Sequence, residues 1–242
     1  MGRHNTIAGR KAAQDSKRAA SFTKYARAIM IAAKAGGDPD YNPSLRTAID
    51  KAKQAGLPND NINRAIKKGT GELEGEQLEE LRFEGYGAGG VAVIVEALTD
   101  NRNRTTSSVS HAFDKFGGNL GTPGCVSYMF NRKGLFVFDK EESEVTEDEL
   151  MDVVLDAGAD DITEYEDSFE VVCEPDAFAD VAQAIKDAGW VTADADITLV
   201  PTMEATPDEK QLATLRRMLD ALEEDDDVQK VYNNSAIDPY EE

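Results

Sequence analysis

The hydrophobic pattern of this chain changes its period close to Arg82. Before that point, alanines and larger apolar residues recur at helical spacing over residues 8–35, and two shorter helical segments follow. After it, apolar runs of strand length alternate with helical segments. The pattern therefore predicts an α+β chain in which an all-helical N-terminal domain precedes α/β structure.

Capping residues mark the two shorter helices. Asn42 is predicted to cap the first of them, and Asn59 or Asp60 is predicted to cap the second. Gly56 and Gly69 follow the expected ends of these helices, where a glycine commonly terminates a helix. Residues 1–70 are therefore predicted to form a small helical domain, followed by a Gly- and Glu-rich linker at 70–80.

Two α/β units are predicted after residue 80. Residues 135–200 have the order β-α-β-β-α-β of a ferredoxin-like domain. The elements that flank this stretch make a second unit of similar order. The predicted strands are 91–98, 125–130, 135–138, 161–166, 169–174, 197–200 and 228–232, with a turn at 131–134, and the predicted helices are 105–116, 146–157, 176–188 and 207–222.

This order of elements predicts how the domains are connected. The expected boundaries are 1–80 for the basic helical domain, 81–133 with 201–242 for a discontinuous middle α/β domain, and 134–200 for an inserted domain. Two adjacent α/β domains are the alternative.

Charge is divided unequally along the chain. Residues 1–70 contain fourteen Lys and Arg against five Asp and Glu, a net of +9, whereas the rest carries −30 and the whole chain −21. Such asymmetry indicates contact with a polyanion at the basic end, while the acidic remainder repels phosphate and orients the encounter. Packing of the basic segment on the acidic body of the same chain is the alternative.

The basic residues of the N-terminal segment recur at helical spacing. If residues 8–35 form one helix, Arg3, Arg10, Lys17 and Lys24 share one stripe and the alanines lie opposite. A break near Ser21 rotates the second half away from this stripe. The predicted nucleic-acid contacts are Arg3, Arg10, Lys11, Lys17, Arg18, Lys24, Arg27, Lys67, Lys68, Arg102 and Arg104.

Several of these positions have a structural interpretation as well. Lys67 and Lys68 suit the C-terminus of a helix, whose dipole favours cations. Arg102 and Arg104 lie where a strand leads into a helix, and two arginines beside a helix N-terminus can receive phosphate. The alternative is that Asp100, Asn103 or Thr105 caps that helix while the arginines pair with nearby carboxylates.

A second glycine-rich stretch, residues 85–90 (GYGAGG), resembles a phosphate-binding loop. The dinucleotide fingerprint follows a strand and opens a helix, whereas these glycines precede the strand at 91–98. A turn that needs positive φ is therefore the prediction, and no nucleotide cofactor is expected.

The remaining motifs argue against catalysis and metal binding. The sequence has no G-x-S-x-G elbow, P-loop or H-E-x-x-H, and its two histidines, His4 and His111, form no evident triad. Cys125 and Cys173 lack metal-ligand spacing and are expected to be reduced, small core residues in the cytoplasm. The acidic runs at 141–149 and 223–227 are interpreted as solvated. No apolar run approaches the about 18 residues of a membrane span.

Several separate stretches, in the right order, resemble the YebC/PmpR family, whose mitochondrial relatives include a translational activator of cytochrome c oxidase. The stretches are residues 10–18 (RKAAQDSKR), 61–71 (NINRAIKKGTG), 84–95 (EGYGAGGVAVIV), 98–105 (LTDNRNRT) and 117–121 (GGNLG). The resemblance covers nearly the whole chain. It implies a helical domain and two α/β domains, one inserted into the other.

The resemblance also implies a non-enzymatic role in gene expression. Bacterial relatives are described as DNA-binding transcriptional regulators, and others act on ribosomes as translation factors at stretches such as polyproline. Arg10, Lys11, Lys17 and Arg18, with the loop arginines above, become the contact candidates. Two departures stand out: Thr6-Ile7 replace a Trp in a slightly shorter segment, and Ala88 replaces a Pro common in the glycine turn.

The sequence thus predicts a cytoplasmic, non-enzymatic regulator that binds DNA or ribosomal RNA without a cofactor, metal or membrane, with the ribosome as a further expected partner. Phosphate contacts are expected to make binding steeply salt-dependent. An acidic protein-interaction adaptor that binds basic partners without nucleic acid is the rival hypothesis.

Overall fold

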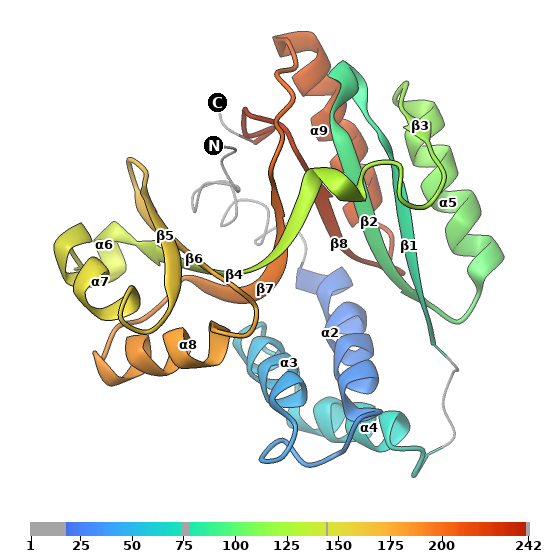
Figure 1. Cartoon of the computed structure of the whole chain (residues 1–242). Helices are drawn as coiled ribbons and strands as arrows, with labels where there is room; N and C mark the ends of the chain where they lie inside the picture. The colour runs from blue at the N-terminus through green and yellow to red at the C-terminus, as the bar shows by residue number, and fades with distance from the viewer. Residues whose placement is uncertain (1–17, 74–77, 144, 241–242) are drawn as a thin grey trace. The chain divides into compact units, whose positions relative to one another are not determined.

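The computed structural model describes residues 18–73, 78–143 and 145–240 (Figure 1). These residues form two compact units: 18–127 with 205–233, and 128–204 with 234–240. The first unit, here called the head unit, contains three N-terminal helices and one sheet. The second, the inserted unit, interrupts the head unit along the chain. The α+β class with two separate sheets is confirmed.

Three helices open the head unit, and they pack around α2. Their bounds are α2 (Arg18–Ala33), α3 (Pro43–Gln54) and α4 (Asn59–Gly69). Ile29 of α2, Leu45 of α3 and Ile62 of α4 are buried in one shared core. The Asn42 side chain accepts a hydrogen bond from Leu45 N at 3.1 Å, so the predicted cap of α3 is confirmed.

The predicted cap of α4 is wrong. Neither Asn59 nor Asp60 caps the helix, because α4 begins at Asn59 and Pro58 occupies the cap position without a side-chain acceptor. The Pro58 carbonyl oxygen accepts hydrogen bonds from Asn61 N at 2.9 Å and Ile62 N at 3.1 Å. A backbone carbonyl oxygen, and not an Asn or Asp side chain, therefore accepts hydrogen bonds from the free N–H groups at the start of α4.

Gly69 does more than end a helix. A Cβ atom at this position would overlap the Met30 carbonyl oxygen and lie 2.7 Å from Ala33 Cβ. Glycine at residue 69 therefore lets the last turn of α4 approach the backbone of α2, which a larger side chain prevents.

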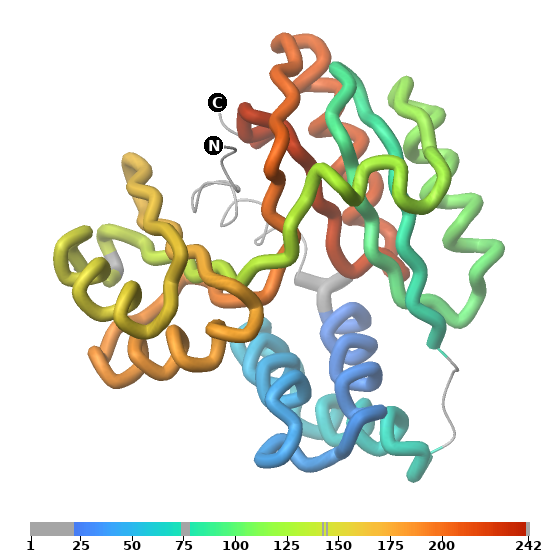
Figure 2. Tube along the Cα trace, viewed as in Figure 1, coloured from blue at the N-terminus to red at the C-terminus, as the bar shows by residue number. Residues whose placement is uncertain are grey.

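The sheet of the head unit, sheet A, has the strand order β3-β1-β2-β8 with antiparallel neighbours. Its strands are β1 (Glu79–Tyr86), β2 (Ala92–Thr99), β3 (Asn119–Leu120) and β8 (Val228–Asn233). Two helices, α5 (Arg102–Lys115) and α9 (Glu209–Glu223), contact each other beside this sheet. Figure 2 shows the chain returning to sheet A near its C-terminus: β8, coloured red, lies beside β2, coloured green.

Gly87, Gly89 and Gly90 lie in the turn of the β1–β2 hairpin, whereas Gly85 is part of β1. Gly89 and Gly90 have φ angles of 73° and 72°, so the turn interpretation is confirmed and the strand β2 follows directly. A Cβ at Gly89 would lie 2.8 Å from Pro207 Cβ, so the turn also packs against the chain entering α9.

The inserted unit contains sheet B, with the order β5-β6-β4-β7 and antiparallel neighbours throughout. Its elements are β4 (Phe130–Asp139), α6 (Lys140–Ser143), α7 (Glu147–Val154), β5 (Ala159–Glu164), β6 (Ser168–Cys173), α8 (Phe178–Asp187) and β7 (Asp194–Pro201). This is the ferredoxin-like arrangement predicted from residues 135–200. Sheet A differs in order, since its central strands are the β1–β2 hairpin.

The predicted strand at 125–130 and turn at 131–134 are wrong. Residues 127–129 form a short 3-10 helix, and β4 runs without a break from Phe130 to Asp139. Asn131, Arg132 and Lys133 pair with Val200, Leu199 and Thr198 of β7. Strand pairing over long sequence separation therefore overrides the turn preference of Asn131 and Gly134.

Within the described part of the chain, no helix is long and apolar enough to cross a membrane.

Candidate nucleic-acid interface

Two of the predicted contact residues meet at one carboxylate in the head unit. Arg27 of α2 and Arg104 of α5 both bind Asp227, which lies in the turn between α9 and β8. Arg27 Nη1 is 2.7 Å from Asp227 Oδ1, and Arg104 Nη2 is 2.7 Å from Asp227 Oδ2. Only 4% of the Asp227 side chain and 12% of the Arg27 side chain are exposed. The charge of Arg27 is therefore compensated inside the protein.

Two hydroxyl groups complete the surroundings of Asp227. Thr105 Oγ1 donates to Oδ2 at 2.7 Å and Thr99 Oγ1 donates at 3.1 Å. Burial raises the pKa of Asp227, but hydrogen bonds from Thr105, Arg104 and Arg27 outweigh it and hold that pKa below its usual value. Hydrogen bonds to Asp227 and Asp100 raise the pKa of Arg104. Asp227 is thus an ionised, buried anchor, which corrects the interpretation of residues 223–227 as a solvated acidic run.

Further contacts attach α2 to the same turn. Arg27 Nη1 also donates to the carbonyl oxygens of Asp226, at 2.6 Å, and Leu98, at 3.2 Å. Lys24 Nζ donates to the carbonyl oxygen of Glu223 at 2.5 Å. Lys24 and Arg27 therefore hold α2 to the end of α9 and to the turn before β8.

The N-terminus of α5 matches the structural alternative more closely than the phosphate-binding one. Asn101 caps the helix by accepting a hydrogen bond from Arg104 N at 3.1 Å, so the capping residue is none of the three predicted. Arg104 also bonds Asp100 at 2.7 Å, and Arg102 bonds Glu79 at 2.7 Å. Carboxylates thus surround the position where a phosphate was expected.

Other basic side chains of the helical segment are open to solvent. Lys67 of α4 is exposed and Lys68 is half-buried. Lys53 of α3 and Arg64 of α4 are also exposed, although the sequence reasoning did not single them out. Among the described residues, Lys53, Arg64 and Lys67 have no ion-pair partner, in contrast to Arg27, Arg102 and Arg104.

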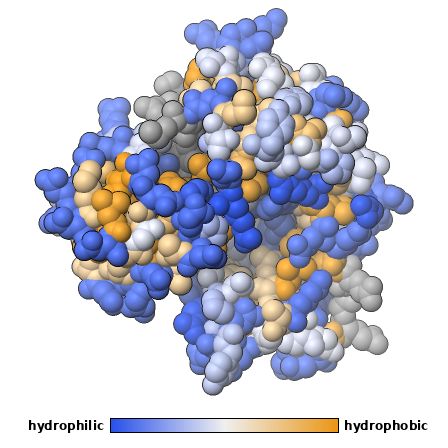
Figure 3. All heavy atoms as spheres, viewed as in Figure 1, coloured by the Kyte–Doolittle hydropathy of each residue, from blue (hydrophilic) through white to orange (hydrophobic). Residues whose placement is uncertain are grey.

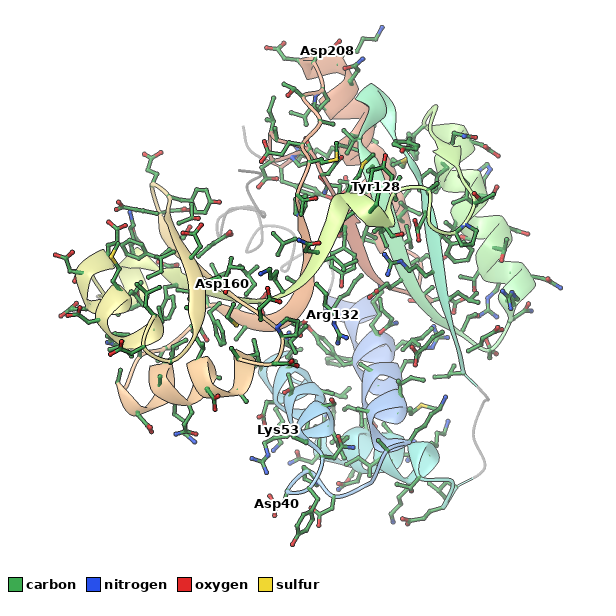
Figure 4. All side chains as sticks on the ribbon, in the orientation of Figure 1. Asp40, Lys53, Tyr128, Arg132, Asp160 and Asp208 are labelled. Atoms are coloured by element: carbon green, nitrogen blue, oxygen red, sulfur yellow. The ribbon has the colours of Figure 1, made fainter. Side chains whose placement is uncertain are left out.

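The spacing of these residues along the helices is the sequence signal that could have identified them as exposed. Arg64 and Lys67 are three residues apart, which places them on one side of α4, opposite the buried Ile62 and Ala65. Lys53 lies on the outer side of α3 (Figure 4), and hydrophilic side chains cover this lower part of the visible surface (Figure 3). The exposed set Lys53, Arg64 and Lys67 is called the α3–α4 basic set below.

The remaining predicted contacts lie before α2 or at its first residue. Arg3, Arg10, Lys11 and Lys17 lie outside the described residues, and Arg18 is the first residue of α2. Their role in nucleic-acid binding stays a prediction.

A cavity of about 300 Å³ lies beside the outer edge of β1 in the head unit. Its lining includes Arg82, Glu84 and Arg102. The Glu84 carboxylate is already hydrogen-bonded within the protein, because its Oε2 accepts hydrogen bonds from Val126 N at 3.1 Å and Ser127 N at 3.0 Å. Among the residues that the structure describes, no group of three His, Cys, Asp or Glu side chains is placed to hold a metal ion.

Two family models account for almost the entire chain. The TACO1/YebC protein N-terminal domain matches residues 2–72, and the TACO1/YebC second and third domain matches residues 78–235. The chain belongs to the TACO1/YebC family. The family resemblance found in the sequence motifs is thereby confirmed.

Curated relatives of this YebC-family chain share about half of its residues. A probable transcriptional regulatory protein of Clostridioides difficile is 50% identical over 98% of this chain and 100% of its own length. One of Listeria innocua with the same description is 51% identical over 96% of this chain and 97% of its own.

The fold of this YebC-family chain has also been seen in a crystal. The structure of a conserved hypothetical protein from Aquifex aeolicus is similar, with a TM-score of 0.82 and 46% identity. The match covers 92% of this chain and 91% of that one.

Proposed function

We propose that this protein is a non-enzymatic regulator of gene expression that binds nucleic acid through its basic N-terminal segment. The observation that carries the proposal is the α3–α4 basic set, three exposed cationic side chains without ion-pair partners among the described residues. It belongs to the segment whose net charge is +9 in a chain of −21. The name of the relatives, probable transcriptional regulatory protein, agrees with a regulatory role.

The proposed contact surface differs from the one predicted by sequence alone. Lys24, Arg27 and Arg104 are assigned to fixing the fold, because each is bound to the last residue of α9 or to the turn that follows it. Lys53, Arg64 and Lys67 take their place, together with the basic residues before α2. Long, exposed cations such as these reach phosphate oxygens while the helix backbone stays in place.

Salt dependence tests the proposal directly. The full-length protein is titrated into fluorescent duplex DNA and single-stranded RNA of equal length at several salt concentrations. We expect log Kd to rise linearly with log salt, by about 0.7–0.9 for each neutralised phosphate. Binding that is absent for both probes, or unaffected by salt, contradicts the proposal.

A charge-matched pair of variants tests the surface itself. Arg64→Glu with Lys67→Glu is expected to weaken binding by about tenfold or more and to lower the salt slope. Lys186→Glu with Lys210→Glu makes the same change in net charge at exposed positions elsewhere and serves as the control. Equal affinities of the two variants would remove the α3–α4 basic set from the interface.

The target is DNA or ribosomal RNA, and each has an observation in its favour. The relatives' names favour transcription and hence DNA. The net charge of −30 after residue 70 favours the ribosome, where RNA and basic proteins lie close together and both ends of the chain find a partner. Sedimentation of a cell lysate on a sucrose gradient separates ribosome-bound, DNA-bound and free protein.

An acidic protein adaptor is the second candidate function. The same −30 net charge supports it, because acidic surfaces attract basic partners. Pull-downs before and after nuclease treatment distinguish the two. Partners that survive nuclease support the adaptor, and partners that disappear support nucleic-acid binding.

A further inference from the structure

The outer edge of sheet A is formed by β1, and β3 covers only one end of it (Figure 1). β3 pairs with Gly85 and Tyr86, and beyond this pair the Glu84 carbonyl oxygen accepts a hydrogen bond from Gly121 N at 2.8 Å. Among the residues that the structure describes, no strand pairs with residues 79–83 on this side. An unpaired strand edge of this kind can pair with a further strand.

The backbone groups of Glu80 and Arg82 point outward along this open edge. Gly87 N donates to the Val91 carbonyl oxygen at 2.7 Å, which extends the β1–β2 ladder and places the odd-numbered residues of β1 toward β2. The Glu84 carbonyl oxygen points the other way, toward β3. Backbone groups of successive residues alternate between the two edges of a strand, so Glu80 and Arg82 each present an N–H and a C=O at the outer edge.

Solvent reaches the open edge. The side chains of Glu79, Glu80 and Arg82 are exposed. Residues 80–84 form one wall of the cavity of about 300 Å³ beside β1, and the rest of its lining comes from the start of α5 and from the segment after β3. The edge is therefore accessible to another chain in solution.

Helix α5 leaves space for a further strand beside residues 79–83. Near the start of α5, Arg104 binds Asp227, which directly precedes β8 on the far side of β2. Near the end of α5, Phe113 approaches Gly85, where an added Cβ would lie 2.8 Å from Phe113 Cε1. The helix therefore crosses the sheet obliquely and comes closest to the outer edge beyond its open part.

The charges along the open edge are self-complementary. If Leu81 lies opposite Leu81 of a second copy in an antiparallel pair, Glu80 lies opposite Arg82 of that copy, and Arg82 lies opposite its Glu80. Opposite charges that face each other across antiparallel strands stabilise the pair. Because both residues have outward backbone groups, each Glu80–Arg82 pair also exchanges two hydrogen bonds between the backbones.

Neighbouring registers lack this complementarity. A two-fold axis at Glu80 places two glutamates opposite each other, and an axis at Arg82 places two arginines opposite each other. Like charges in these positions are destabilising. An axis at Phe83 requires the outward backbone groups of Glu84, whose carbonyl oxygen already accepts the hydrogen bond from Gly121. The charges therefore select the register centred on Leu81.

We infer that the open edge of β1 is the docking site for the same edge of a second copy of this chain, in the register centred on Leu81. The two copies of sheet A then form one continuous sheet across a two-fold axis. Arg82 Nε is 3.4 Å from Glu84 Oε1, and 39% of the Arg82 side chain is exposed. Its guanidinium therefore keeps N–H groups for the Glu80 carboxylate of the second copy.

The pairing involves few residues, so it is expected to be weak and reversible. Residues 79–83 extend over about 17 Å, whereas the interfaces of obligate homodimers bury about 2,000 Å² or more. Pairing of one short edge buries much less than that. Dimers are therefore expected at high protein concentration and are expected to dissociate on dilution.

The pairing has a consequence that rests on the proposed function. Each copy carries one α3–α4 basic set, so a dimer offers two such sets to one nucleic acid. Two linked binding sites raise the apparent affinity for a nucleic acid that is long enough to reach both. A dimer is therefore expected to bind long probes more tightly than short ones.

Sedimentation velocity of the full-length protein without nucleic acid tests the pairing. Over about a hundredfold range of protein concentration, we expect the wild type to shift from monomer toward dimer. Glu80→Arg and Arg82→Glu each place like charges across the axis, so each is expected to raise the dimer Kd by about tenfold or more. A wild type that stays monomeric over the whole range, or a dimer that both variants leave unchanged, overturns the inference.

An equimolar mixture of the two variants tests the register. Glu80→Arg chains carry two arginines at the edge and Arg82→Glu chains carry two glutamates, so a heterodimer regains both ion pairs. The mixture is expected to recover most of the wild-type association, and a mixture that associates as weakly as the separate variants overturns the inference. Asp152→Arg and Arg217→Glu make the same charge changes at exposed positions elsewhere and are expected to dimerise like the wild type.

Disulfide formation gives a second measurement of the register. In a Cys125→Ser background, Leu81→Cys places two thiols opposite each other at the axis, where the Cα atoms of a non-hydrogen-bonded pair lie about 4.5 Å apart, within disulfide range. Under mild oxidation, we expect a covalent dimer on a non-reducing gel. Phe83→Cys is the matched control on the same face of β1, because its two copies lie about 14 Å apart in this register. Equal yields from the two variants, or none from Leu81→Cys, overturn the inference.

Titration with long and short nucleic-acid probes separates this inference from the proposed function. If the wild type dimerises and binds no probe, the proposed function fails and the pairing stands. If the protein stays monomeric and still binds the probes in a salt-dependent way, the pairing fails and the proposed function stands.

Discussion

Arg104 contacts both carboxylate oxygens of Asp227, with Nη2 2.9 Å from Oδ1 and 2.7 Å from Oδ2, and Nε 3.1 Å from Oδ2. The two residues are separated by 123 positions in the sequence. Their pairing ties the N-terminus of α5 to the turn before β8, and Arg27 adds α2 to the same point. One carboxylate therefore joins the helical segment to sheet A through two of the arginines that the sequence predicts as nucleic-acid contacts.

Asp227→Asn is expected to lower the free energy of unfolding by about 3 kcal/mol, because it leaves the nearly buried Arg27 guanidinium without its counter-charge. Urea unfolding followed by circular dichroism measures the change. Asp226→Asn is the control, since that side chain is exposed and only its carbonyl oxygen contacts Arg27. A loss below about 0.5 kcal/mol for Asp227→Asn would contradict the structural role of the cluster.

The stability that Asp227 provides is expected to depend on pH. Its pKa is lower in the folded state than the unfolded value of about 3.9. A depressed folded pKa means that the contribution is present above about pH 4 and is lost as the pH falls through the folded pKa. Urea unfolding at a series of pH values is expected to show the wild type and Asp227→Asn converging in acid. A constant difference between pH 7 and pH 2 would show that ionisation of Asp227 is unimportant.

Gly69→Ala is expected to lower the free energy of unfolding by about 1–3 kcal/mol, because the new Cβ overlaps the Met30 carbonyl oxygen and must push α4 from α2. Thermal unfolding measures the loss. Lys68→Ala, one residue earlier, leaves the helix contact intact and is expected to change stability by no more than about 0.5 kcal/mol. Equal free energies of unfolding for the two variants would contradict the close packing of α4 on α2 at Gly69.

Arg102→Ala is expected to change stability by less than about 1 kcal/mol, because its ion pair with Glu79 is largely exposed, with 65% of the Arg102 side chain open to solvent. Arg104→Ala is expected to cost more, since it removes the two-oxygen contact with the buried Asp227. Unfolding of both variants side by side in urea checks the order. The reverse order would contradict the account of the Asp227 cluster.

The two cysteines are expected to react with thiol reagents at different rates. Burial raises the pKa of Cys173 to about 11, and its side chain is fully buried, so it reacts only when the inserted unit opens. Cys125 is half-buried and is expected to react first. Labelling of Cys125→Ser and Cys173→Ser variants at pH 8 with a disulfide reagent assigns the two phases. Faster labelling of Cys173 would show that the inserted unit opens more readily than its core implies.

Local patterns predicted much of this fold because local physics determines it. Asn42 caps α3 and the glycines at 87–90 form a turn, since both depend on hydrogen bonds and φ angles within a few residues. The strand at 135–138 was predicted, but its extension through 131–134 was missed because the pairing there depends on β7, some sixty residues further along the chain. The cap of α4 was missed because a proline carbonyl replaces a side-chain acceptor.

The sequence by itself determined the α+β class, the ferredoxin-like order of the inserted unit, the family and the basic character of the N-terminal segment. Only the tertiary structure decided which basic residues remain exposed. Arg27 and Arg104 look the same in the sequence as Arg64 and Lys67, but Asp227 lies far from both arginines along the chain and reaches them only in the folded protein. Long-range electrostatic pairing leaves no local pattern, so it becomes visible only when the chain has folded.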